Sequence, residues 1–203
     1  VGAINDISER TGVRAINTHD DNQGLVLVAK DGRNITVAFT STLTASNSGI
    51  AAAGTYVGSF DLSTKDGSSF TVSSQTDGQI ENAGLRVGAY QSNVAQFASL
   101  QRSATASGTV PGDGTATTGE LLGNTLVING VGIDAAVGGD DDASNIEAAS
   151  SVKSASAIAI AAAINKKTDL TGVRAVAEPN VLRGTGFNNG EVTTRSEEHT
   201  SEL

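Results

Sequence analysis

A stretch of thirteen residues near the start of the chain recurs 160 positions later, and this internal repeat constrains the fold more than any other feature. Residues 3–15 and 163–175 share Ala-Ile-Asn at their beginning and Thr-Gly-Val-Arg-Ala at their end, so eight of the thirteen positions are identical. The five residues between these blocks differ in sequence but not in number, which indicates a preserved backbone geometry. The identical positions are Ala3, Ile4, Asn5, Thr11, Gly12, Val13, Arg14 and Ala15 in the first copy, and Ala163, Ile164, Asn165, Thr171, Gly172, Val173, Arg174 and Ala175 in the second.

The residues before the second copy predict a short amphipathic helix. Segment 151–165 is rich in alanine and isoleucine, and its apolar residues recur at the helical spacing of three and four. We expect an N-cap at Asp142, Ser144 or a later serine. The apolar face is expected to pack on the sheet of its own module rather than on a partner. It consists of Ala157, Ile160, Ala161 and Ile164.

A turn and a strand are expected after this helix. Gly172 is predicted to make the turn, because glycine adopts positive φ without steric cost. Residues 173–176 then predict a strand, with Val173 and Ala175 on one face and Arg174 on the other. Each copy of the repeat is therefore expected to form a helix-turn-strand unit.

Hairpins are expected around these units, because apolar segments flank glycine-containing turn signals. Tyr56, Phe60 and Phe70 are the larger core candidates among them. The predicted hairpins are 121–133 with a turn at Asn129-Gly130, 24–29 with 34–39 through Asp31-Gly32, and 55–62 with 69–73 through Lys65-Asp66-Gly67.

The fold class expected from these elements is α+β, built of small hairpin-rich modules that each carry a short Ala-rich helix. Residues 1–102 form the first module, truncated at its start, and residues 119–194 form the second, truncated at its end. Segment 103–118 has little to bury and is assigned as a linker. Residues 195–203 resemble the translation of a DNA sequencing adaptor and are set aside as an artefactual tail.

Composition excludes several classes of function. The chain has 13 basic and 22 acidic residues, a formal charge of −9, so a nucleic-acid partner is not expected. The most apolar stretch, 155–164, is too short to span a bilayer, so no membrane association is expected. The chain contains no cysteine, which excludes disulfides and thiolate metal sites.

No catalytic residue is predicted. Catalysis by acid–base or nucleophilic chemistry requires groups at hydrogen-bonding distance, and His19, the only histidine before the tail, lies in a polar turn-like stretch. We therefore expect no enzyme activity and no cofactor. The glycine-rich segment 184–190 lacks the spacing of a phosphate loop and is interpreted as a turn.

No metal site is predicted either. Asp140-Asp141-Asp142 and His19-Asp20-Asp21 offer oxygen atoms, but neither has the alternating spacing of a calcium loop. Asn34-Ile35-Thr36 matches the N-glycosylation pattern but lies on a predicted strand. Arg14 and Arg174 are open to two interpretations, a contact with a neighbouring subunit or an outward residue paired locally with a carboxylate, of which we favour the second.

The repeated Ala-Ile-Asn and Thr-Gly-Val-Arg-Ala blocks resemble the hook IN motif of bacterial flagellins. Leu126-Val-Ile-Asn-Gly-Val-Gly-Ile133 precedes the second copy, and 24–36 resembles the hairpin that follows the motif in flagellins. The resemblance covers most of the chain. The long terminal helices that polymerise a flagellin filament are absent from these residues.

This resemblance implies the central, surface-exposed region of flagellin, a structural component of the extracellular filament that contributes to motility without catalysis. Its partners would be other flagellin subunits, contacted through regions outside this chain, and its Ser/Thr-rich surface would be open to O-linked glycans. The alternatives are a module of a filament cap or hook-associated protein, which share the motif, and an adhesive or glycan-binding surface domain.

Overall fold

The computed structural model describes residues 1–20, 22–40, 42–75, 80–91, 102–105, 119–144 and 152–187. It confirms the α+β class, with short helices beside small antiparallel sheets. The helices are α1 (Gly2–Asn5), α2 (Ser8–Thr11), α3 (Ala45–Ser48), α4 (Ala157–Asn165) and α5 (Thr168–Thr171), with 3-10 turns η1 (Ile80–Ala83), η2 (Gly138–Asp140) and η3 (Lys153–Ala155). The artefactual tail assigned to 195–203 lies outside the described residues.

The strands form four sheets in the described part of the chain. One sheet has the order β1 (Arg14–Asn17), β2 (Leu25–Ala29), β12 (Asn180–Arg183), and a second has the order β3 (Ile35–Val37), β4 (Gly54–Val57), β8 (Arg102–Thr105). A third has the order β10 (Val131–Gly132), β9 (Leu126–Ile128), β6 (Ser69–Ser74), β7 (Gly88–Gln91), and the last pairs β11 (Val173–Ala177) with β5 (Phe60–Thr64). All the pairings are antiparallel.

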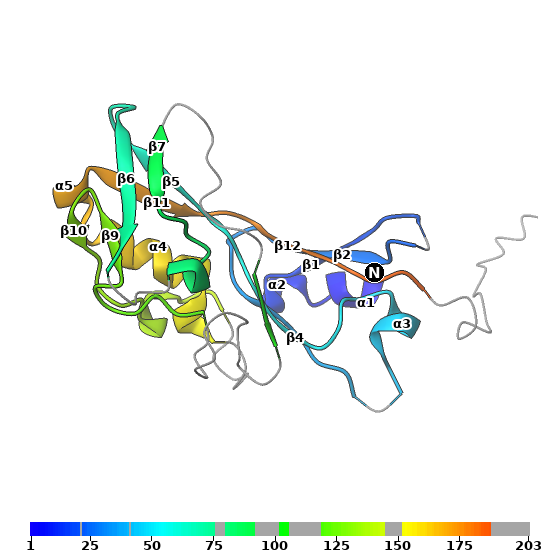
Figure 1. Ribbon diagram of the computed structural model, residues 1–203. Helices are drawn as coiled ribbons and strands as arrows, with labels where there is room; N and C mark the ends of the chain where they lie inside the picture. The colour runs from blue at the N-terminus through cyan, green and yellow to red at the C-terminus, as the bar shows by residue number, and fades with distance from the viewer. Residues whose placement is uncertain are drawn as a thin grey trace, which may run out of the picture.

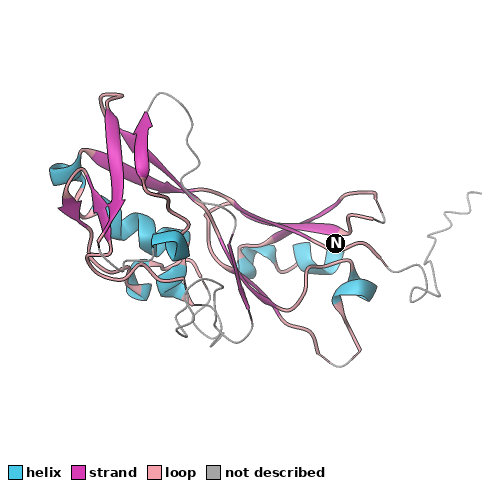
Figure 2. Ribbon diagram, viewed as in Figure 1, coloured by secondary structure: helices cyan, strands magenta, loops and turns pink. Residues whose placement is uncertain are grey.

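These elements form two lobes, each with its own hydrophobic core (Figure 1). The helix lobe comprises the described residues of 58–91 and 119–178, and its core surrounds α4 with side chains from β5, β6, β9 and β11. The strand lobe comprises the described residues of 1–57, 102–105 and 179–187, and Figure 2 shows its short helices beside the strands. Its core is Ala15, Leu27, Ala29, Ile35, Val37, Ala51 and Leu182.

The two cores do not follow the sequence-based division into 1–102 and 119–194. Strand β5 from the first segment pairs with β11 from the second, and β6 pairs with β9. In the opposite direction, β12 returns to pair with β2. Residues 103–105, assigned to the linker, belong to β8, which pairs with β4; residues 106–118 lie outside the described part. Each lobe is therefore assembled from both halves of the chain.

The hairpin at Asn129-Gly130 is confirmed. Ile128 is opposite Val131, and the turn residues have φ angles of 49° and 81°, the positive values that a two-residue hairpin loop requires. The other two predicted hairpins are wrong. Asp31-Gly32 and Asp66-Gly67 do reverse the chain, but β2 and β3 lie in different sheets, as do β5 and β6. Both edges of β2 are already paired, with β1 and β12, so β3 pairs with β4 instead.

The predicted helix begins later than 151, at Ala157, and the N-cap is Ser156, whose side chain accepts a 3.1 Å hydrogen bond from the Ala159 amide. The four predicted core residues are buried, as are Ala159 and Ala163. Helix α4 is thus buried over most of its circumference rather than amphipathic. Alanine side chains permit this because they let β11, β5 and the 3-10 turns η2 and η3 approach the helix closely.

The three predicted aromatic core residues are divided between the two cores. Phe60 and Phe70 are buried in the helix-lobe core, and Phe70 stacks on Tyr90 with ring centroids 5.5 Å apart. Tyr56 is half-buried against the strand-lobe core, and its hydroxyl donates to the Ala52 carbonyl.

Candidate functional site, a duplicated helix-turn-strand motif

The two copies of the repeat adopt the same backbone conformation. In each, a helix ends at asparagine (α1 or α4), a four-residue helix follows (α2 or α5), and a strand begins after glycine (β1 or β11). Ile7 and Lys167, which differ completely in chemistry, have φ/ψ values of −108°/10° and −112°/10°. Gly12 and Gly172 are both left-handed, with φ of 69° and 73°. The expectation that the spacer preserves geometry without preserving sequence is confirmed.

The repeated asparagine clamps the strand that follows it. Asn5 donates from Nδ2 to the carbonyl oxygen of Ala15 at 3.1 Å and accepts from the amide of Ala15 at 2.8 Å. Asn165 makes the same pair of bonds to Ala175, at 2.9 and 2.8 Å. Only an amide side chain can both donate and accept in this way. This explains why the asparagine is identical in the two copies, whereas the residues of the five-residue spacer are not.

The repeated threonine stabilises the turn. The Thr11 hydroxyl lies 3.2 Å from the carbonyl oxygen of Ile7 and accepts a 3.2 Å bond from the amide of Val13. In the second copy, the Thr171 hydroxyl lies 3.1 Å from the carbonyl oxygen of Lys167, and it accepts from the Val173 amide at 3.1 Å. The glycine amide that follows closes the same helical turn in both copies. Asparagine and threonine are thus the identical polar residues of the repeat that fix its backbone.

The clamp lies on the open side of an edge strand. Among the described residues, strands β1 and β11 each have one neighbouring strand, β2 or β5. The repeated asparagine bonds to backbone groups of the strand that follows it in the sequence. An uncovered sheet edge is a template for pairing with other chains. In each copy the motif therefore covers part of the sheet edge, because the asparagine occupies the backbone N–H and C=O of one residue of the edge strand.

The apolar residues of the repeat are buried to different degrees in the two copies. Ile164 and Val173 are completely buried, whereas Ile4 and Val13 are partly buried beside the strand-lobe core. The small residue in mid-strand, Ala15 or Ala175, is buried in both copies. The second copy is anchored in the helix-lobe core by the whole of α4, but the first copy has the single turn of α1.

The repeated arginines, Arg14 and Arg174, point to solvent from their strands, as the alternation of the strand residues predicted. Neither is within ion-pair distance of a carboxylate among the described residues. The local ion pair that we favoured from the sequence is therefore not formed there. Arg33 is an arginine that does form an ion pair: it donates to Asp31 and, at 3.0 Å, to the Thr11 carbonyl oxygen.

Arg33 links the first copy to the polar turn at 31–33. Partial burial alone would raise the pKa of Asp31, but hydrogen bonds and charge from Arg33 lower it below its ordinary value. The pKa of Arg33 is raised, mainly by the same hydrogen bonds, with a smaller contribution from the charge of Asp141. The guanidinium lies directly over Gly12, where a side chain would collide with it. Sequence inspection did not associate these residues, which are 21 positions apart.

His19 is exposed in a turn, with a φ of 55°, and its amide donates to Asn17. The neighbouring Asp20 has a pKa below its ordinary value because the backbone amide of Asn22 and the side chain of Gln23 donate to it. Asp21 lies outside the described residues. Within the residues that the structure describes, no three His, Asp or Glu side chains are grouped so that they could hold a metal ion.

The carboxylate of Asp141 is buried and engaged in hydrogen bonds. It accepts from the amides of Ala143 and Ser144 at 3.0 and 2.9 Å and from the Ser144 hydroxyl at 2.7 Å. Ser144 in turn accepts a 2.9 Å bond from the amide of Asn34 in the strand lobe. Asp140 forms an ion pair with Lys166. Asp141 thus caps a turn that links the lobes, and the Asp-x-x-Ser spacing was the signal for it.

Asn34, the asparagine of the glycosylation pattern, is buried, with its side-chain amide donating to the carbonyl of Val152. A glycan at this atom would have to displace the lobe contact. In the glycine-rich segment, Gly184 packs against backbone at Gly49 and Leu25, and residues 188–190 lie outside the described part.

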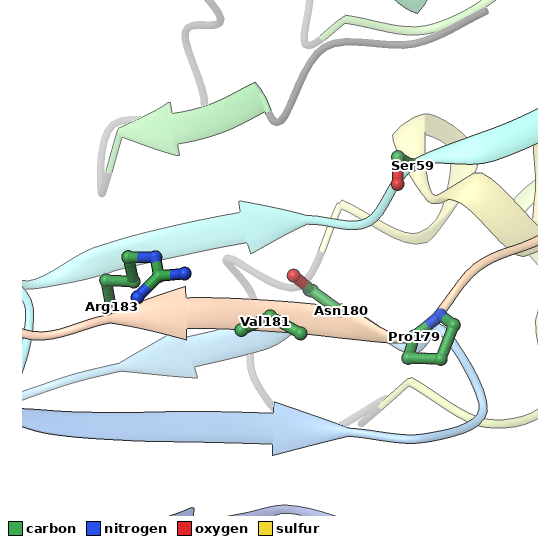
Figure 3. A pocket seen from close by; sticks show the side chains of 5 residues that line it. All are labelled: Ser59, Pro179, Asn180, Val181 and Arg183. Carbon is green, nitrogen blue, oxygen red and sulfur yellow. The ribbon is translucent and has the colours of Figure 1, made fainter. Parts of the chain in front are cut away.

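A pocket of about 330 Å³ lies beside β12 and is lined by Ser59, Pro179, Asn180, Val181 and Arg183 (Figure 3). Asn180 is 2% exposed and donates to the carbonyl oxygens of Arg33 and Tyr56. These bonds join β12 to the turn at 31–33 and to β4. Its Oδ1 has no hydrogen-bond partner among the described residues. The polar side-chain groups of its lining other than the buried Asn180 are the Ser59 hydroxyl and the Arg183 guanidinium. These groups suit hydration or a small polar molecule.

Comparisons of the chain with protein-family models, with curated proteins and with solved structures found no match. The described part has no helix of the length and hydropathy needed to span a bilayer. The duplicated motif is therefore the feature on which a functional proposal has to rest.

We expect Gly12→Ala to destabilise the protein more than Gly172→Ala. Both substitutions force alanine into the left-handed region, at a cost of about 1–2 kcal/mol. The added carbon is unobstructed at Gly172, but at Gly12 it displaces Arg33 from the Thr11 carbonyl, which costs roughly 1 kcal/mol more. Urea unfolding followed by circular dichroism measures the difference. Equal losses would contradict the described position of Arg33.

Asn165→Asp is expected to lower the free energy of unfolding by about 1–2 kcal/mol. Aspartate can still accept from the Ala175 amide but cannot donate to the Ala175 carbonyl. Asn5→Asp should have an effect of the same size, because its two bonds have nearly the same lengths. Thermal unfolding of both variants tests this, with Asn17→Asp as the control, because Asn17 is exposed and aspartate can still accept from the His19 amide. A tolerated Asn165→Asp would show that the clamp does not stabilise the strand.

Proposed function

We propose that this chain is an outer-surface module of bacterial flagellin, a structural part of the extracellular flagellar filament that contributes to motility without catalysis. The observation that carries the proposal is the identity of the clamp in the two copies. The residues that resemble the flagellin hook IN motif, above all its asparagine, threonine and glycine, are the residues that hold each strand in place.

The chemistry of the clamp agrees with a structural role. A surface module repeated along a polymer lies close to many identical modules, so an open sheet edge would favour irregular pairing between them. The clamp covers part of two such edges, and the formal charge of −9 favours solvation. In this proposal, other flagellin subunits are bound through regions outside the chain, and O-linked glycans are attached to exposed serine or threonine.

Immunogold electron microscopy of cells that carry the gene tests this proposal. Antibodies raised against the folded chain are expected to decorate filaments along their whole length. Labelling restricted to the filament tip would favour a cap protein, and labelling at the junction of hook and filament would favour a hook-associated protein. Cells with intact flagella that bind no antibody on any part of them would overturn the flagellar assignment.

The flanking sequence gives a second test. Long helices with heptad-like apolar patterns on both sides of the chain are expected for flagellin. A glycan array separates the adhesive alternative. Tight binding of a defined sugar that depends on Tyr56 or Tyr90 would replace the structural proposal. Both hydroxyls already donate to backbone carbonyls, of Ala52 and Arg86 respectively.

A further inference from the structure

In both copies of the repeat, a side chain from another segment also holds the turn. Arg33 donates from Nη1 to the carbonyl oxygen of Thr11 at 3.0 Å. In the second copy, Asn129 donates from Nδ2 to the equivalent carbonyl oxygen, that of Thr171, at 2.8 Å. The helix pairs α1-α2 and α4-α5 are therefore each fixed by the same two devices, an asparagine clamp and one donor from outside the motif.

The two helix pairs differ in burial. Helix α4 contributes six buried residues to the helix-lobe core. Neither α1 nor α2 contains a buried residue, and Ile4 is only partly buried beside the strand-lobe core. Among the described residues, the side-chain hydrogen bonds that join segment 2–12 to the chain beyond Val13 are those of Asn5 and Arg33. This segment, which we call the cover, should therefore detach more readily than its counterpart.

The cover lies beside β1, on the edge that faces away from β2 (Figure 1). The backbone groups of Ala15 point to this edge, because they bond to Asn5. Consecutive residues of a strand direct their backbone groups to alternate edges, so those of Arg14 and Ile16 point toward β2 and those of Asn17 return to the covered edge. Detachment of the cover would therefore expose a strand edge that can accept a further strand.

This edge is complementary to itself in an antiparallel arrangement. If two copies of β1 pair with Ala15 at the two-fold axis, the two Ala15 residues face each other and can exchange both backbone hydrogen bonds. Arg14 of each strand is then opposite Ile16 of the other, and both side chains are exposed, Ile16 by 53%. The aliphatic part of arginine can pack on isoleucine, and no like charges are opposed. The edge thus fits a second copy of this chain.

We propose that the cover is releasable, and that β1 pairs antiparallel with β1 of a second copy when the cover detaches. The resulting dimer is two-fold symmetric, because both copies use the same edge. The second copy of the motif does not behave in this way, since α4 cannot leave β11 without opening the helix-lobe core. This inference extends the structural role of the clamp and does not depend on the flagellar assignment.

Hydrogen exchange of the wild-type chain tests the release of the cover. The amides of Ala15 and Ala175 both donate to a clamp asparagine at 2.8 Å. Both also follow an arginine, so their exchange rates without protection are the same. The Ala15 amide should exchange about tenfold faster or more, because exposure of the Ala175 amide requires opening of a core. Equal protection of the two amides contradicts a releasable cover.

Sedimentation velocity of two matched double variants tests the pairing. Asn5→Ala with Arg33→Ala removes both devices of the first copy, and this variant is expected to dimerise between about 10 µM and 1 mM while the wild type stays monomeric. Asn165→Ala with Asn129→Gly removes the equivalent bonds of the second copy, with glycine retaining the positive φ of the turn. It should lose stability but stay monomeric. A first-copy variant that associates no more than the wild type or the control overturns the proposal.

A further substitution identifies the strand edge that is used. Ile16→Lys in the first-copy variant places a lysine opposite Arg14 of the other strand twice in each dimer, and should raise the dissociation constant roughly tenfold. Val181→Lys is the control, because Val181 is on β12, at the other side of the same sheet. It should change the dissociation constant much less. Equal effects of the two lysines would overturn the assignment of the contact to the β1 edge.

Circular dichroism melts establish that each variant is folded at the temperature of the measurement. If the first-copy double variant is unfolded, Asn5→Ala takes its place, with Asn165→Ala as its control. In the folded dimer, the Ala15 amide should regain protection from exchange as the protein concentration rises, because it then bonds to the second copy. Association of unfolded chains would not single out this amide. A folded dimer without this concentration dependence overturns the proposal.

Discussion

Replacing Ile164 by alanine is expected to lower the free energy of unfolding by about 2–5 kcal/mol, because it leaves a cavity in the helix-lobe core. Ile164 is completely buried on α4, and α4 packs closely on β11. The equivalent substitution in the first copy, Ile4→Ala, should cost about 1 kcal/mol, because Ile4 is only partly buried. Equivalent isoleucines of the two copies are thus expected to contribute different amounts to the free energy of unfolding.

Urea unfolding followed by far-ultraviolet circular dichroism measures both losses, since the chain has no tryptophan to serve as a fluorescent reporter. Ile164→Val, which removes one methylene group, is the graded control and should cost about 0.5–1.5 kcal/mol. Equal losses for Ile164→Ala and Ile4→Ala would mean that the helix-lobe core does not enclose α4 as described.

Asp141→Ala is expected to destabilise the protein by roughly 2–4 kcal/mol, because it leaves two amides and a hydroxyl without their acceptor at a buried position. The bond from the Asn34 amide to Ser144 depends on this turn, so the junction between the lobes should loosen as well. The adjacent Asp142→Ala, at an exposed position, should change stability by less than about 0.5 kcal/mol.

Thermal unfolding measures this pair of variants, and hydrogen exchange at the Asn34 amide reports on the junction directly. Millimolar calcium is expected to leave the unfolding midpoint unchanged, because both oxygens of Asp141 already accept hydrogen bonds. A midpoint that rises with calcium in the wild type but not in Asp141→Ala would show that the triplet binds the ion instead.

The helix, turn and strand of the repeat were predictable because they depend on local sequence signals. Glycine favours a positive φ, β-branched residues favour a strand, and alanine and isoleucine at helical spacing favour a helix. Each of these preferences extends over about ten residues, so it produces the same turn, strand or helix in both copies. The turn at Asn129-Gly130 was predictable for the same reason, since the two turn residues select the hairpin by their own backbone preferences. The Asn165 clamp also acts locally, but its bonds to Ala175 emerged only with the coordinates.

The choice of strand partners was not predictable from these signals. Asp31-Gly32 turns the chain as expected, but whether β3 lies beside β2 depends on whether that edge of β2 is free, and β12, about 150 residues away, occupies it. The exchange of β5, β6 and β12 between the two halves follows from burial. Each short strand has too few apolar residues to form a core alone, so the available apolar faces decide the pairing.

The sequence by itself determined the α+β class, the repeat and the conformation of each copy, because hydrogen bonds between near neighbours and backbone preferences are encoded where they act. Only the tertiary structure decided which strands pair, that Asp141 caps a turn between the lobes, and that Ile164 is buried while Ile4 is half-exposed. These properties depend on residues more than a hundred positions apart, such as Asn34 and Ser144. Burial and strand pairing between residues so far apart in the sequence depend on the whole chain, so a local sequence pattern does not predict them.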